Sequence, residues 1–137
     1  MNTKNIKAII NDQHTQVTVK YDINKLEMRF SEADNFRKIY RGKDIYACLA
    51  KVRADFPQIT FLCKGAKINV MPSRMASQMS AGLVAYEMTL GKHAAQDNIV
   101  HLFDYEENNL TNDPQVQIDF FKTWLASIGA EDYEKLN

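Results

Sequence analysis

The histidines and cysteines are the residues of this sequence whose chemistry could hold a metal ion or support redox catalysis. His14, His93 and His101 do not form the close pair, with thiols or carboxylates beside it, that a zinc site needs. Cys48 and Cys63 lack the CxxC spacing of a metal or disulfide-exchange motif. Two isolated cysteines are typical of reduced, buried apolar residues. The sequence therefore predicts no metal site and no cofactor.

Residues for nucleophilic or acid–base catalysis are not arranged in a recognisable motif either. Ser73 and Ser77 lack the lysine of a serine hydrolase motif, and the chain has no nucleophile elbow. Glu106 and Glu107 are adjacent, so in an extended segment their side chains point in opposite directions and would not cooperate as acid and base. We therefore expect a protein that is not an enzyme.

Charge is unevenly distributed along the chain, although the formal net charge is zero. Basic residues outnumber acidic ones up to Gln96, and from there on the only basic residues apart from histidine are Lys122 and Lys135. The acidic residues of this last part are Asp97, Asp104, Glu106, Glu107, Asp113, Asp119, Glu131, Asp132 and Glu134. This pattern predicts an acidic surface, which either keeps the protein soluble or docks a basic partner.

Length and composition limit the class of protein. The chain has 137 residues, a length typical of one domain with its own apolar core. A neutral net charge disfavours direct binding to nucleic acid. The N-terminus is polar and no apolar run has membrane-spanning length, so we expect no signal peptide, no membrane contact and a cytoplasmic location.

Hydrophobic periodicity predicts the elements of the first part of the chain. Strands are expected at residues 6–10, 16–21 and 26–30, where apolar or β-branched residues alternate or form short runs. Short turns between them imply an antiparallel meander with one solvated face. Residues 31–41 are expected to be a loop or a short helix. Residues 43–56 are expected to form a helix, with Ile45, Leu49, Val52 and Phe56 on one face and Pro57 as the stop.

The rest of the chain is predicted to add strands around a short helix. Residues 59–71 read as a strand interrupted at Gly65, followed by a helix over 74–80, a left-handed stop at Gly82, and strands over 83–90 and 99–105. A second long helix begins at Asp113 and Pro114 and ends at Gly129. We expect one α+β domain over 1–137, an antiparallel sheet with helices packed on one face and a mobile tail at 131–137. The predicted core contains Leu49, Val52, Phe61, Ile68, Leu83, Phe120 and Trp124.

About a third of the chain, from Cys63 to Glu107, resembles bacterial toxin-immunity proteins, which are encoded beside polymorphic toxins or contact-dependent growth inhibition toxins. The pattern consists of Cys63-Lys64-Gly65-Ala66, Pro72-Ser73, Met75, Met79, Gly82, Ala85-Tyr86, Leu90-Gly91-Lys92 and Phe103-Asp104. The resemblance implies a cytoplasmic antitoxin that binds one cognate toxin domain and blocks it. Such toxins are often nucleases with basic active sites, which an acidic surface would cover.

The predicted function is therefore that of an immunity protein whose acidic surface covers the active site of a toxin domain. Its predicted partner-binding residues are Asp104, Tyr105, Glu106, Glu107 and Asp113. One alternative is a small enzyme with a site assembled from the distant residues His93, Tyr86 and Asp104. Another is a regulatory or ligand-binding subunit of a larger assembly.

Overall fold

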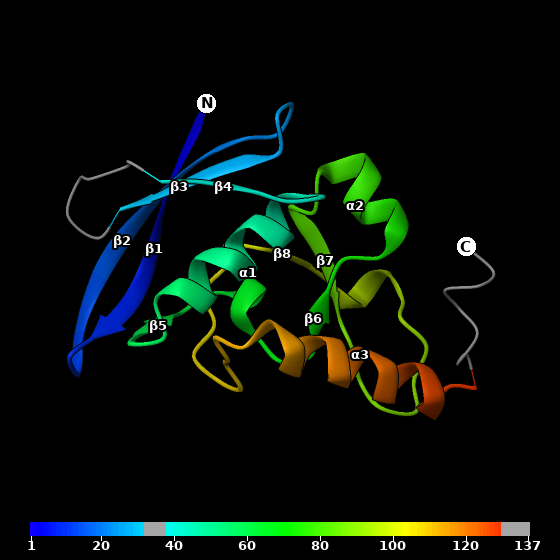
Figure 1. The fold of residues 1–137 in the computed structure, drawn as a ribbon. Coiled ribbons are helices and arrows are strands. Elements are labelled where there is room, and N and C mark those ends of the chain that lie inside the picture. Colours follow the sequence, from blue (N-terminus) through cyan, green and yellow to red (C-terminus); the bar gives the residue numbers. More distant parts are fainter. Residues whose placement is uncertain (32–37, 130–137) are drawn as a thin grey trace.

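The computed structural model describes residues 1–31 and 38–129, which form two antiparallel sheets and three α-helices (Figure 1). The larger sheet has the strand order β4-β3-β2-β1-β5. Its strands are β1 (Asn2–Ile10), β2 (Gln13–Asp22), β3 (Glu27–Ser31), β4 (Ile39–Arg41) and β5 (Ile59–Phe61). The smaller sheet has the order β6-β7-β8, with β6 (Val70–Met71), β7 (Val84–Glu87) and β8 (Ile99–His101). The predicted α+β class and the antiparallel meander are confirmed.

The helix α1 (Ile45–Asp55) lies against β3 and β4 and completes the main core. It begins after Asp44, whose Oδ1 accepts a hydrogen bond from the Ala47 N–H at 2.7 Å, as an N-cap does. Leu49 and Val52 are fully buried, as predicted, and so is Phe61 on β5. Alternation along the strands gives the sheet one buried and one more exposed face. On β3, for example, Met28 and Phe30 are buried, whereas Arg29 between them is half-exposed.

The remaining helices begin at the caps that the sequence indicates. Ser73 Oγ accepts from the Ala76 N–H at the start of α2 (Arg74–Ser80). Asp113 caps α3 (Pro114–Ser127), with Pro114 in its first turn. A second apolar cluster of Met88, Trp124 and Leu125 joins α3 to the segment after β7.

Four of the predicted elements differ from the structure. Residues 59–71 do not form one strand, because Lys64–Ala66 is a 3-10 turn whose Gly65 N–H donates to the Leu102 carbonyl. A Cβ on Gly65 would lie 2.4 Å from Leu102 Cδ1, so a close approach of two segments ends the sheet here. The strands predicted over 83–90 and 99–105 are shorter, because β7 ends at Glu87 and β8 at His101. Residues 39–41, predicted as loop or helix, form β4, whereas 32–37 and the predicted tail at 131–137 lie outside the described residues.

The prediction of the core is correct for Trp124 and for the residues of α1 and β5, but the other three predicted core residues are less buried than expected. Ile68, Leu83 and Phe120 are half-buried; Leu83 packs against the main cluster and Phe120 against the second one. Among the described residues, no helix combines the length and apolar character that crossing a membrane requires.

Gly82→Ala is expected to lower the free energy of unfolding by more than Gly91→Ala. Both glycines have positive φ, +76° and +78°, so alanine at either costs on the order of 1 kcal/mol of backbone strain. At Gly82 the new Cβ would also lie 2.8 Å from Asp44 Cγ, whereas nothing lies within 4 Å of a Cβ at Gly91. Urea unfolding of the two variants measures the difference, and equal costs would contradict the close packing of Gly82 on the α1 cap.

Candidate functional site

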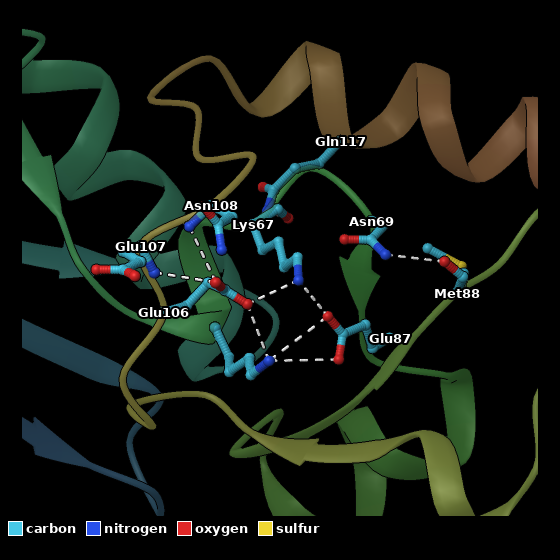
Figure 2. Close-up of polar contacts among 9 residues, drawn as sticks. Lys67, Asn69, Glu87, Met88, Glu106, Glu107, Asn108 and Gln117 are labelled. Atoms are coloured by element: carbon cyan, nitrogen blue, oxygen red, sulfur yellow. Dashed lines mark hydrogen bonds and ion pairs between the residues drawn. The ribbon is translucent and has the colours of Figure 1, made fainter.

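Two lysines and two glutamates form a compact ion-pair cluster between the smaller sheet and the loop that follows β8 (Figure 2). Lys64 Nζ lies 2.9 Å from Glu106 Oε1 and 3.3 Å from Glu87 Oε2. Lys67 Nζ lies 2.7 Å from Glu106 Oε1 and also contacts Glu87 Oε1. The two positive and two negative charges balance one another, and we call these four residues the Lys–Glu cluster.

Backbone hydrogen bonds bring the cluster together from three distant segments. The 3-10 turn positions Lys64 and Lys67, and the Lys64 N–H donates to the Asp104 carbonyl at 2.8 Å. The Glu106 N–H donates to the Leu62 carbonyl at 3.3 Å, next to an isolated bridge between Cys63 and Tyr105. The last residue of β7, Glu87, supplies the second carboxylate.

The carboxylate of Glu106 fixes the conformation of the loop that carries it. Its Oε2 accepts hydrogen bonds from the backbone N–H groups of Glu107 and Asn108, both at 2.9 Å (Figure 2). Burial alone would raise the pKa of Glu106, but the hydrogen bonds from Lys67, the Asn108 N–H and Lys64 lower it to about 2. Burial likewise opposes ionisation of Lys67, yet the two carboxylates hold the pKa of this lysine above its usual value.

Glu106 therefore differs from the predicted role of an exposed contact residue. It is 8% exposed and both of its oxygens are occupied, so its charge is not presented to a partner. The single sequence cannot indicate this, because the two lysines that neutralise Glu106 lie about 40 residues away in the chain.

The residues on either side of Glu106 do face solvent, as predicted. Tyr105 is 48% exposed, and Asp104 and Glu107 are exposed beside it. The Tyr105 hydroxyl donates to Glu107 Oε2 at 3.0 Å, and this hydrogen bond raises the pKa of Tyr105. Lys7 Nζ lies 5.5 Å from the centre of the Tyr105 ring. Residues 104–107, which we call the anchored loop, thus expose one aromatic ring and two carboxylates.

Asp113 is also exposed, but its side chain has a structural role. Its Oδ1 accepts from the Gln115 N–H at 2.9 Å and caps α3. The predicted set thus contains three exposed residues (Asp104, Tyr105 and Glu107), one buried member of the Lys–Glu cluster (Glu106) and one helix cap (Asp113).

A buried arginine behind the cluster was missed by sequence reasoning. Arg53 is fully buried; its Nη2 donates to Gln117 Oε1 at 2.6 Å and its Nη1 to the Thr111 carbonyl. Gln117 Nε2 in turn donates to the carbonyls of Gly65 and Lys67, at 3.1 and 2.8 Å. This network joins α1 and α3 to the turn that carries the lysines. One signal was available, since Arg53 follows Leu49 by four residues on the apolar stripe of α1.

The alternative catalytic set is only partly brought together. Tyr86 and His93 line one groove, but Asp104 is not among its lining residues. Among the described residues, no three histidines, cysteines or acids are placed to hold a metal ion. Burial raises the pKa of the Cys63 thiol to about 11, so this thiol is not activated as a nucleophile.

Comparison of the chain with models of protein families and with curated proteins finds no match. The resemblance to immunity proteins therefore stays a prediction.

Proposed function

We propose that the protein is an immunity protein that binds a cognate toxin domain through its anchored loop. The observation that carries this proposal is the exposed Tyr105 between two exposed carboxylates, on a loop held from beneath by Glu106. Tyrosine is enriched among the residues that dominate binding energy at protein interfaces. A loop already fixed in one conformation loses little entropy on binding, which favours affinity.

The charge of the exposed side chains indicates the chemistry of the partner. The carboxylates of Asp104 and Glu107 form no ion pair with described residues, so they are available to a basic surface. Carboxylates at an interface rim speed association with a basic partner, and those at the centre add to its specificity. A toxin with a basic active site, such as a nuclease, supplies this kind of surface.

The test is binding of the Asp104→Lys/Glu107→Lys and Tyr105→Ala variants to the toxin domain encoded next to this protein. Each variant is expected to bind at least about tenfold more weakly than the wild type, and wild-type binding should weaken with added salt. Calorimetry at two salt concentrations measures affinity, and growth of toxin-exposed cells measures protection. Glu106 is left unchanged because its loss would disturb the fold.

Asp97→Lys provides the matched control, because Asp97 is an exposed acid of the same part of the chain outside the anchored loop. It is expected to bind and protect like the wild type. Wild-type affinity in both anchored-loop variants would show that the interface lies elsewhere. Absence of binding by the wild-type protein would reject the immunity function itself.

A further inference from the structure

A groove of about 440 Å³ lies between the smaller sheet and α3, away from the anchored loop. Its walls include Met71, Tyr86 and Met88 from the sheet side, and Phe121 and Trp124 from α3. His93 lies at the groove on the segment between β7 and β8. Pockets that bind small molecules have this size and this combination of apolar walls with a few polar groups.

Hydrogen bonds between the β7–β8 segment and α3 build the groove. The Trp124 Nε1–H donates to the Lys92 carbonyl at 2.9 Å, and the Gly91 N–H donates to Ser127 Oγ at 2.8 Å. They hold the indole ring in place and fix the chain immediately before His93. The ring centres of Phe121 and Trp124 lie 6.0 Å apart with a tilt of 31°, so the α3 wall is an aromatic surface.

The polar groups of the groove have unused hydrogen-bonding capacity. Within the described residues, the Tyr86 hydroxyl and the His93 ring make no hydrogen bond or ion pair. Ser73 Oγ also lines the groove; it accepts from the Ala76 N–H and retains its own proton for donation. All three groups can donate as well as accept, and the described lining has no carboxylate that would repel an anion. A ligand that uses all three donors carries an acceptor, of which a carboxylate is the strongest.

We propose that this groove binds a small aromatic carboxylate. The aromatic ring packs on Trp124 and on the thioethers of Met71 and Met88, which favour contact with aromatic rings. The carboxylate accepts hydrogen bonds from His93 and Tyr86. This site is independent of the proposed toxin interface, because neither Asp104 nor any other residue of the anchored loop lines it.

The ligand class can be tested directly because Trp124, the only tryptophan of the chain, is a wall of the groove. Phenylacetate is titrated into the full chain while the tryptophan fluorescence is recorded, alongside 2-phenylethanol, which lacks the carboxylate, and cyclohexylacetate, which lacks the aromatic ring. We expect a saturable change with phenylacetate and at least about tenfold weaker binding of 2-phenylethanol, the loss typical of a missing charge-assisted hydrogen bond. Cyclohexylacetate should also bind more weakly.

Variants of the polar groups separate a specific site from a merely apolar surface. His93→Ala is expected to weaken phenylacetate binding about tenfold, and Tyr86→Phe several-fold. His14→Ala, which removes an exposed histidine elsewhere, should leave it unchanged, as should the Asp104→Lys/Glu107→Lys variant. Circular dichroism confirms that each variant is folded.

Absence of a saturable fluorescence change up to the solubility limit of phenylacetate would overturn the proposal. Equal affinity for phenylacetate and 2-phenylethanol, together with no effect of His93→Ala, would also overturn it. The groove would then be an apolar surface, suited to an uncharged side chain of a partner. None of these outcomes depends on toxin binding, so the two proposals can fail separately.

Discussion

Glu106→Ala is expected to lower the free energy of unfolding by about 3–5 kcal/mol, the usual cost of removing one partner from a buried ion pair. The change leaves Lys64 and Lys67, whose side chains are only 20% and 13% exposed, with the single carboxylate of Glu87. It also removes the acceptor of the Glu107 and Asn108 N–H groups. Urea unfolding of the variant and the wild type measures the loss.

The neighbouring carboxylate is the matched control for this change. Glu107→Ala removes an exposed charge one residue away and is expected to alter stability by no more than about 0.5 kcal/mol. Equal stability of the two variants would mean that the Lys–Glu cluster does not contribute to folding.

The same carboxylate predicts the response of the protein to acid. The pKa of Glu106 is about 2 in the folded chain, below its ordinary value of 4.5, so the folded state favours the ionised form. The stability that this gives is fully present above about pH 4.5 and is lost as the pH falls toward 2. Glu106→Ala should lack this part of the acid dependence, because it has no group to protonate.

Gln117→Leu is expected to lower the free energy of unfolding by about 3 kcal/mol or more. Gln117 is 1% exposed, and its loss breaks three hydrogen bonds in the interior, one of them to a charged guanidinium. Burial already lowers the pKa of Arg53, and no described carboxylate pairs with it. The hydrogen bonds from its guanidinium to neutral acceptors therefore have to replace the bonds that it would make to water. Urea unfolding again provides the measurement.

Gln115→Leu serves as the control, because Gln115 is an exposed glutamine of the same helix and should tolerate the change within about 0.5 kcal/mol. A double-mutant cycle of Gln117→Leu with Arg53→Met tests the contact itself. The two changes should be coupled by about 1 kcal/mol or more, because removing both partners costs less than the sum of the single changes. Strict additivity would contradict a direct contribution from the Arg53–Gln117 hydrogen bond.

The anchored loop links stability to the proposed function. Its exposed face carries Tyr105 and the carboxylates of Asp104 and Glu107, whereas its buried face belongs to the Lys–Glu cluster. Lys64 and Lys67 in turn sit on the turn whose carbonyls bind Gln117. The conformation of the proposed contact surface thus depends on buried and half-buried residues outside that surface.

Short-range patterns were sufficient for much of the fold. The alternation of Met28 and Phe30 predicts β3, and the stripe through Leu49 and Val52 predicts α1, because burial of one face imposes a period on the chain. The caps at Ser73 and Asp113 are local as well, since their acceptors bind N–H groups two or three residues further on. The α+β class follows from these elements and was predicted correctly.

Long-range contacts govern the features that local patterns missed. The run from 59 to 71 alternates like a strand, but its N–H groups at Lys64 and Gly65 bond to the carbonyls of Asp104 and Leu102 instead of to a sheet neighbour. The acidic run along the chain also failed to predict the surface charge at Glu106, because two lysines distant in the sequence pair with this glutamate and neutralise it. The groove beside Trp124 is also assembled from segments far apart in the sequence. Spacing along one chain carries no information on which distant groups meet, so the Lys–Glu cluster and the groove became visible only in three dimensions.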